Sequence, residues 1–202
     1  MTPDDKAPAS DRALYDRADR AMGRYADGDE AAFAEVFAVV GPRIQRFLRR
    51  LCGADELARD LFQDTLLRMH QARGAFRPGA AVLPWAYAIA RNAFVDSARA
   101  RKRRPVTIGG TGADEPAEPA VAPDAESSVL ANETARAVAR ALAGMTDARR
   151  EAFVLVRFEG MSIADAAQIL GASENAVKLR AFQAYEIIRG ELGRLEKPGA
   201  LS

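Results

Sequence analysis

The chain contains 202 residues, enough for one large or two small domains, and its formal net charge of +1 does not by itself indicate a nucleic-acid ligand. The single cysteine, Cys52, cannot form an internal disulfide, so a cytosolic setting fits and the thiol is expected to pack as a small core residue. No apolar run approaches the ~20 residues that span a bilayer, and the N-terminus lacks the apolar core of a signal peptide, so direct membrane insertion is not expected.

Two amphipathic segments follow a polar stretch, residues 1–10, which is expected to be disordered. The first segment places apolar residues at helical spacing over 14–25 and ends at the turn signal Asp27-Gly28. The second keeps that spacing over 33–51, but Gly41-Pro42 interrupts it. The sequence therefore predicts a short helix and then a longer one that is kinked or briefly broken.

A third helix is predicted over 55–71, and its exposed face is acidic. Asp60, Gln63, Asp64 and Leu67 fall on this face, at i, i+3, i+4 and i+7. An acidic face with one exposed leucine fits a docking surface for a protein, although a solvated face with a stray apolar residue looks the same. His70 is the only histidine and has no cysteine nearby, so no metal site is predicted.

Residues 76–104 read as a loop, one helix and a basic run. Arg77, Pro78 and Gly79 mark the loop, and Pro84 suits the first turn of a helix that continues to about Ala100. Trp85 lies at helical spacing inside an apolar segment, so it is expected to pack in the core rather than to stack on bases.

One face of this helix begins with a side-chain amide and ends in cations. It carries Asn92, Asp96, Arg99 and Arg103, and the basic run adds Arg101, Lys102 and Arg104. Clustered cations suit phosphates, and a loop beside an amide and a cationic tail suits an unpaired base. The alternative is an ordinary core helix with a solvated basic end.

The segment 105–127 is rich in proline, glycine and acidic residues and reads as a flexible linker. It lacks the spacing of a phosphate-binding loop. The linker divides the chain into two compact helical domains, 1–104 and 128–202. Because no segment shows the alternating pattern of a strand, the predicted fold class is all-α.

The second domain contains the pattern of a helix-turn-helix. Thr146 is expected to cap a helix over 147–158, and Ser162 a short helix that ends at Gly171. Ser173 caps a longer helix over 174–189, whose buried stripe is Val177, Ala181, Ala184 and Ile188. The exposed side would then present Glu174, Asn175, Lys178, Leu179, Phe182 and Gln183 to the major groove. An αα-hairpin packed in a bundle is the alternative.

The order of these parts resembles the extracytoplasmic-function (ECF) sigma factors, the two-domain members of the bacterial sigma-70 family. The resemblance rests on DLFQDTLLRMH at 60–70, on the stretch 76–104, and on the helix-turn-helix after a variable acidic linker. It implies a transcription initiation factor in the bacterial cytoplasm, with 1–104 as sigma region 2, 105–127 as linker and 128–202 as region 4.

The resemblance also implies partners. Asp60, Gln63, Asp64 and Leu67 would dock on the β′ clamp of core RNA polymerase, and the second domain would contact the β flap. Phe76 and Arg77 would belong to the loop that captures a flipped base of the −10 element, and Asn92 would line its pocket beside Asp96. The run Arg99–Arg104 would hold promoter phosphates.

The second domain would read the −35 element of promoter DNA. Its residues at or near DNA would be Ser173, Glu174, Asn175, Lys178, Leu179, Arg180, Phe182 and Gln183. Gln183 stands where the family often has a basic residue, and Leu179 where it often has a small polar one, so the −35 sequence is not predicted.

The resemblance implies an anti-sigma factor as a further partner, and no cofactor or small-molecule substrate. No catalytic triad or metal cluster is evident, so the chain is not expected to be an enzyme. Two other functions are weighed: a helix-turn-helix repressor or activator that works without polymerase, and a sigma-like decoy that binds an anti-sigma factor. The acidic face and the loop at Phe76 argue against the first, and the basic run argues against the second.

Overall fold

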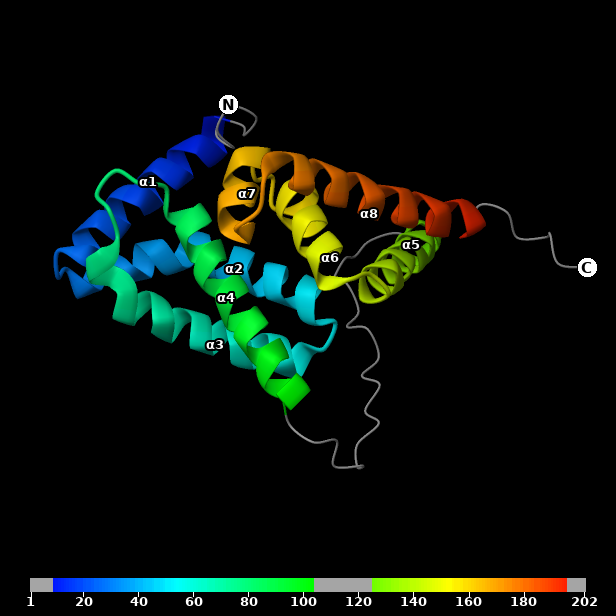
Figure 1. The fold of residues 1–202 in the computed structure, drawn as a ribbon. Coiled ribbons are helices and arrows are strands. Elements are labelled where there is room, and N and C mark those ends of the chain that lie inside the picture. Colours follow the sequence, from blue (N-terminus) through cyan, green and yellow to red (C-terminus); the bar gives the residue numbers. More distant parts are fainter. Residues whose placement is uncertain (1–8, 104–124, 196–202) are drawn as a thin grey trace, which may run out of the picture.

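The computed structural model describes residues 9–103 and 125–195, and every regular element in those ranges is a helix. The first half consists of α1 (Ala9–Ala26), α2 (Phe33–Cys52), α3 (Asp55–Ala72) and α4 (Val82–Arg103), with 3-10 turns at Glu30–Ala32 and Arg73–Ala75. The second half consists of α5 (Ala125–Ala143), α6 (Asp147–Phe153), a π-helical turn, η4 (Val154–Phe158), α7 (Ile163–Leu170) and α8 (Glu174–Leu195) (Figure 1). The predicted all-α fold class is confirmed.

The boundaries differ from the predicted ones at several places. α1 begins at Ala9, inside the stretch expected to be disordered, and the helix expected over 147–158 is α6 followed by η4. α4 begins at Val82 and runs to Arg103, so the expected face from Asn92 to Arg103 lies on one unbroken helix. α5 begins at Ala125, inside the segment expected as linker, while Arg104 and the rest of that segment to residue 124 lie outside the described residues. α8 continues to Leu195, beyond the predicted end.

Of the kink or short break predicted at Gly41-Pro42, the break does not occur, since α2 runs through Pro42 as one helix. Proline has no N–H to donate, so the carbonyl of Ala38, four residues earlier, loses its helical partner. Both Ala38 and Pro42 are exposed, and water can reach that carbonyl. Gly41 is buried, where the Phe37 ring would lie 3.1 Å from an added Cβ.

The core of the first half forms because the apolar spacing of α1, α2, α3 and α4 turns one stripe of each helix inward. Its largest fully buried side chains are Met22, Val36, Val40, Ile44, Phe47, Leu48, Leu51, Met69, Val82 and Tyr87. Phe47 and Tyr87 pack edge to face at 5.1 Å between ring centroids, which joins α2 to α4. Cys52 packs at the edge of this core, and burial raises the pKa of its thiol to about 11, so the thiol stays protonated at neutral pH.

The second half contains the predicted helix-turn-helix. The Ser162 hydroxyl accepts from the Asp165 N–H at 3.0 Å and so caps α7. Gly171 ends α7 in the left-handed region (φ 58°), which a side chain would strain, and Ser173 accepts from the Ala176 N–H at 3.3 Å. Val177, Ala181, Ala184 and Ile188 are buried as predicted.

The two halves pack against each other. α7 lies along α4 in Figure 1, and α2 contacts α5, α6 and η4. Buried side chains of both halves form one continuous apolar cluster. Within the described part of the chain, no helix has both the length and the hydropathy to cross a membrane.

Candidate nucleic-acid interface

The acidic face of α3 is on the surface, as its spacing predicts. Asp60 and Gln63 are exposed, Asp64 is half-buried, and the Leu67 side chain is 54% exposed. The opposite stripe, which includes Leu61, Thr65 and Met69, is buried. One exposed leucine on a surface helix is common, so the exposure of Leu67 fits a docking surface and a solvated face equally.

Arg68 connects this acidic face to α4, and the sequence reasoning missed it. Its guanidinium contacts the Asp64 carboxylate at 3.0 Å and the Asp96 carboxylate at 2.8 Å. The two carboxylates raise the pKa of Arg68, and the arginine partly neutralises both. The spacing of Asp64 and Arg68, at i and i+4, was visible in the sequence, but Asp96 lies 28 residues away from Arg68 along the chain.

The loop between α3 and α4 is held at both ends. The Phe76 ring is buried and packs edge to face on Trp85, at 5.3 Å between centroids. The ring therefore anchors the loop to the core and is not on the loop surface, where a residue in contact with DNA was expected. Arg77, Pro78 and Gly79 are exposed, and Gly79 adopts φ 78° in a turn closed by the Ala80 N–H donating to the Arg77 carbonyl at 3.0 Å. At the start of α4, the Val82 N–H donates to Asp19 of α1 at 2.7 Å.

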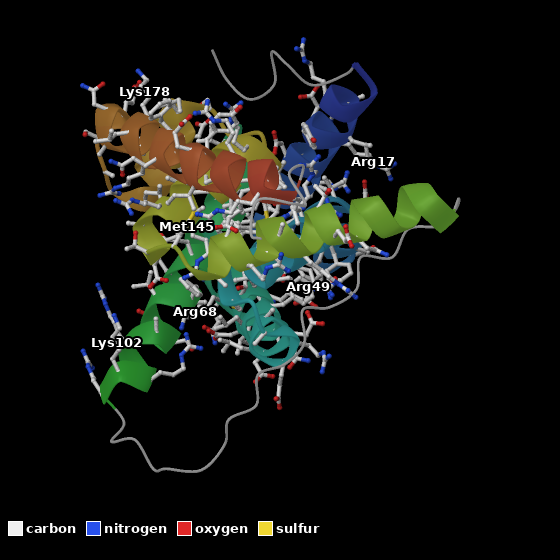
Figure 2. The ribbon with its side chains drawn as sticks, turned by 90° about the vertical axis from the view of Figure 1, so that its right-hand side faces the viewer. Arg17, Arg49, Arg68, Lys102, Met145 and Lys178 are labelled. Atoms are coloured by element: carbon white, nitrogen blue, oxygen red, sulfur yellow. The ribbon has the colours of Figure 1, made fainter. Side chains whose placement is uncertain are left out.

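The exposed face of α4 carries the predicted residues together. Asn92, Asp96, Arg99 and Arg103 are exposed on one side of the helix, and Arg101 and Lys102 are exposed beside them. Figure 2 shows Lys102 at the free end of α4 with Arg68 nearby. Cations concentrated in the last turn also suit the negative end of the helix dipole.

The exposed side of α8 carries two large apolar side chains, which contacts to DNA phosphates alone would not require. Leu179 is 57% exposed and Phe182 is 61% exposed, whereas Arg180 is half-buried. Ser173, Glu174 and Asn175 are exposed at the start of the helix.

Two of the predicted polar contacts on α8 have partners within the chain. Lys178 lies 3.7 Å from Glu174, and the Gln183 amide oxygen accepts from Arg149 of α6 at 3.0 Å. Arg149 was not predicted, because it is 34 residues away from Gln183 in the chain.

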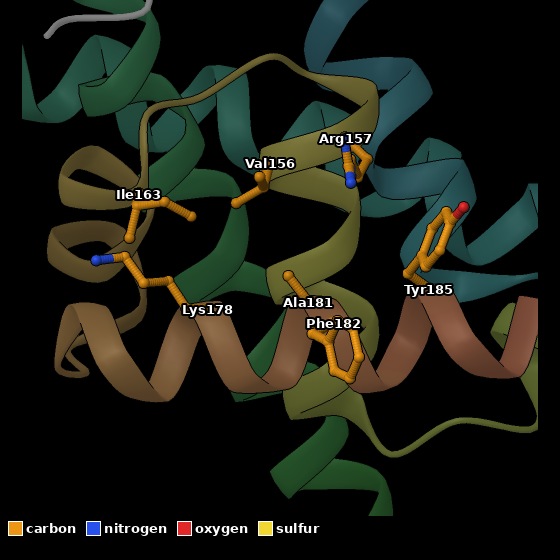
Figure 3. A pocket seen from close by; sticks show the side chains of 7 residues that line it. All are labelled: Val156, Arg157, Ile163, Lys178, Ala181, Phe182 and Tyr185. Carbon is orange, nitrogen blue, oxygen red and sulfur yellow. The ribbon is translucent and has the colours of Figure 1, made fainter.

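A groove of about 400 Å³ runs beside the first turns of α8 (Figure 3). Val156, Ile163 and Ala181 line it together with Lys178, Phe182, Arg157 and Tyr185. The Arg157 guanidinium lies over the Tyr185 ring at 5.6 Å. The groove therefore joins an apolar surface to two cationic side chains, Lys178 of α8 and Arg157 of η4.

Comparisons with known protein families match both halves of the chain. Residues 36–104 match sigma-70 region 2, and residues 135–188 match sigma-70 region 4. The RNA polymerase sigma factor CarQ of Myxococcus xanthus is 37% identical over 87% of this chain and 97% of its own length. The ECF RNA polymerase sigma factor SigM of Mycobacterium tuberculosis is 36% identical over 86% of this chain and 82% of its own length.

The chain belongs to the ECF RNA polymerase sigma factors. This family membership confirms the resemblance drawn from the sequence, and the family consists of transcription initiation factors rather than enzymes. In this sigma factor, α3, α4 and most of α2 lie within the region 2 match, and α6, α7 and most of α8 lie within the region 4 match.

Solved structures share the fold. CnrH, in its complex with the cytosolic domain of CnrY, aligns with a TM-score of 0.65 at 23% identity, over 88% of this chain and 98% of CnrH. The sigma factor RpoE of Bartonella quintana, in complex with the anti-sigma factor NepR, aligns with a TM-score of 0.62 at 23% identity, over 80% of this chain and 96% of RpoE.

Proposed function

We propose that this ECF sigma factor binds core RNA polymerase through the acidic face of α3 and opens promoter DNA with the exposed face of α4. The observation that carries the proposal is the continuous face on α4, where Asn92 is followed by Asp96, Arg99 and Arg103 in water. Arg68 fixes this face to the acidic face of α3 through Asp64 and Asp96. Polymerase docking and promoter contact would therefore be joined by two short ion pairs.

Each part has a physical role in opening DNA. The cations from Arg99 to Arg103, continued by Arg104, would neutralise backbone phosphates, which supplies affinity independent of base sequence. Unstacking one base costs a few kcal/mol, and a pocket between the Arg77–Gly79 loop and Asn92 would offset that cost by hydrogen bonds to the extruded base. The packing of Phe76 on Trp85 would hold the loop in a fixed position relative to the start of α4.

The second half would read the −35 element with the first turns of α8. Asn175, Lys178 and Phe182 are exposed on the side that a recognition helix presents to the major groove. Because Gln183 is held by Arg149, we propose that it reaches DNA only when that hydrogen bond is exchanged for one to a base. Ser173 and Glu174 would contact DNA at the N-terminus of α8, and Leu179 and Arg180 would lie on either side of the face turned to the groove.

Three partners follow from this proposal. They are core RNA polymerase, at the β′ clamp and the β flap; promoter DNA; and an anti-sigma factor, since the sigma factor RpoE of the shared fold is solved in complex with one. Binding at two promoter elements through one chain raises the effective concentration of the second contact after the first. We propose that the activity consists of this binding and DNA opening, in the bacterial cytoplasm where promoters are, and not of catalysis by the chain itself.

Co-elution of the purified chain with bacterial core RNA polymerase tests the proposal. We expect a stable complex, and we expect the double variant Asp60→Ala, Gln63→Ala to weaken it at least about tenfold, because two polar contacts of a docking face are each worth about 1 kcal/mol or more. The matched control is Asp16→Ala, Gln45→Ala, which removes the same two residue types from exposed positions on α1 and α2. Equal affinity of the two double variants would refute the assignment of the α3 face.

A further inference from the structure

The loop between α3 and α4 ends where α4 lacks a cap of its own. The first N–H groups of a helix have no partner inside it, and a serine, threonine, asparagine or aspartate before the helix usually accepts one of them. The residue before α4 is Ala81, which has no side-chain oxygen, and Val82, the first residue of the helix, is fully buried. The Val82 N–H therefore needs an acceptor from elsewhere, because a buried donor without one destabilises the fold.

Asp19 of α1 supplies this acceptor from 63 residues away in the chain. Its carboxylate accepts from the Val82 N–H at 2.7 Å, and Asp19 is half-buried. A carboxylate at this place also opposes the positive end of the α4 dipole, and a hydrogen bond to a charged group is stronger than one between neutral groups. Asp19 thus acts as an N-cap that belongs to a different helix.

The same bond fixes the second end of an exposed loop, residues 77–81. At the first end, the Phe76 ring is buried in the core. Between the ends, the Ala80 N–H donates to the Arg77 carbonyl at 3.0 Å, and Gly79 has the positive φ of a type II turn. Figure 1 shows this loop beside α1, which contacts both α4 and the 3-10 turn that precedes the loop. The 77–81 loop is therefore held at both ends and braced in the middle.

Holding the loop in one shape bears on what it can bind. A loop fixed at both ends has few conformations to lose when a ligand contacts it, whereas a loop with a free end must first be ordered. Unstacking a base is itself unfavourable, so the ordering of a loose loop would add to the cost of opening DNA. Asp19 lies on α1, outside the faces of α3 and α4 that the proposed function assigns to polymerase and DNA. Its removal should therefore act through the loop.

We propose that Asp19 is a positioning residue for promoter opening, which ties the 77–81 loop to α1 in the shape that receives an extruded base. The inference rests on the proposed function, since the loop meets a base only if the chain opens promoter DNA. Asp19 acts through the Val82 N–H and the loop, and it makes no contact with polymerase or DNA itself.

Amide hydrogen exchange, followed by nuclear magnetic resonance in the full chain without partners, tests the bond. We expect Asp19→Ala to speed exchange of the Val82 N–H at least about tenfold relative to that of Ala90 in the middle of α4, because a charge-assisted hydrogen bond is lost. Asp19→Asn keeps an oxygen acceptor and should give a smaller increase. The matched control is Asp16→Ala, which removes an exposed aspartate one turn earlier on α1. Equal Val82 exchange in Asp19→Ala and Asp16→Ala would overturn the proposal.

A second arm measures promoter opening by the holoenzyme, with 2-aminopurine in the −10 element. We expect Asp19→Ala to lower the rate of opening at least about fivefold, because the freedom of at least one loop residue must then be removed when the base binds. Its affinities for core polymerase and for duplex promoter DNA should stay within about twofold of those of the natural chain, since no contact to either is removed. Asp19→Asn should open at an intermediate rate, and Asp16→Ala at the natural one.

The double variant Asp19→Ala, Ala81→Ser separates positioning from stability. Ala81→Ser places a cap directly before α4, so it should restore most of the free energy of unfolding that Asp19→Ala loses. It does not restore the tie to α1, so opening should stay near the rate of Asp19→Ala. Ala81→Ser alone should open as the natural chain does. Recovery of opening together with stability in the double variant would reduce Asp19 to a helix cap and overturn its positioning role.

The two arms distinguish failure of this inference from failure of the proposed function. A natural chain that opens the promoter, with an Asp19→Ala chain that opens it equally fast, would overturn the inference alone. A natural chain that binds no polymerase or opens no promoter would contradict the proposed function and the positioning role with it. Because the exchange measurement uses neither partner, faster Val82 exchange in Asp19→Ala would in that case still establish the bond between α1 and α4.

Discussion

Asn92 is the one amide on a face of α4 that otherwise carries charges. An amide can both donate to and accept from the edge of an unpaired base, whereas the neighbouring arginines can hold phosphates whatever the sequence. In the proposed interface this difference separates two kinds of DNA contact on one helix, so substitutions of Asn92 and of the arginines should impair different steps.

We expect Asn92→Ala to lower the rate of promoter opening at least about tenfold while changing duplex binding less than about twofold. A specific base contact is worth about 1–3 kcal/mol, and that energy is needed only when the base leaves the stack. Fluorescence of 2-aminopurine in the −10 element would report opening, and gel shifts of duplex DNA would report binding.

Arg99→Ala is the contrasting variant on the same face. It should weaken duplex binding. It should also reduce the magnitude of the slope of log affinity against log salt concentration by about 1, because one phosphate contact is lost. Loss of opening and of duplex binding in equal proportion in Asn92→Ala would contradict the role of the amide.

Glu151 gives a prediction about pH. Burial raises its pKa above the ordinary 4.5, and Arg91 opposes that effect only in part. The folded protein therefore keeps a proton on Glu151 over a range in which the unfolded chain has lost it. The stabilisation due to that proton is complete below 4.5 and is lost as the pH rises through the raised pKa.

As the pH rises above 4.5, the free energy of unfolding should therefore fall more steeply, or rise less, in the natural chain than in Glu151→Gln. Urea unfolding at several pH values would measure both slopes. Glu35→Gln provides the opposite sign at pH values below 4.5, because hydrogen bonds from Arg17 and Arg24 lower the pKa of Glu35 and its stabilisation is lost as the pH falls. Parallel curves for the natural chain and Glu151→Gln would contradict the pKa shift.

At the scale of elements, α7 and α6 differ in how their first turns are capped. Ser162 accepts a hydrogen bond from the Asp165 N–H, whereas Thr146 occupies the N-cap of α6 without a side-chain hydrogen bond. The sequence predicted both residues as caps, and only the Ser162 cap contains the expected bond. An N-cap serine or threonine contributes about 1 kcal/mol when its oxygen satisfies a free N–H.

Ser162→Ala should accordingly destabilise the protein by about 1 kcal/mol, and Thr146→Ala by only a few tenths of that amount. The two changes remove a hydroxyl from the same kind of position, so they control for each other in urea unfolding. Similar losses for both variants would show that the Ser162 bond is not what stabilises the start of the helix-turn-helix.

Local spacing predicted the helices and both exposed faces, because the periods of apolar and polar residues carry that information. It could not predict which helices touch. Arg68 and Asp96 are 28 residues apart, Tyr87 and Glu159 are 72 apart, and Arg50 and Glu159 are 109 apart. The Phe76 loop shows the same limit, since periodicity did not indicate that its ring would turn inward onto Trp85.

At the scale of the whole molecule, the length of the connection between α4 and α5 should matter more than its composition. Deleting residues 109–120 would leave about nine residues between the helices, a reach of roughly 30 Å. We expect this variant, as holoenzyme, to protect the −10 element and to lose protection of the −35 element in nuclease footprints. The equal-length control replaces the same residues with glycine and serine, and it should protect both elements.

A footprint that covers both elements in the shortened chain would contradict the importance of that length. Loss of the −35 footprint in the equal-length control would instead assign a role to the acidic residues of the connection, independent of its reach.

The π-helical turn at Val154–Phe158 affects the direction in which the residues after it face. Here the Glu159 N–H donates to the carbonyl of Val154, five residues back, at 3.0 Å. The turn thus stores one residue more than an α-helix would over the same path. A regular α-helix that had to hold the extra residue would instead turn everything that follows by about 100°. The π-helical turn thus sets the direction in which Glu159 faces, toward Arg50 and Tyr87, by absorbing a single residue.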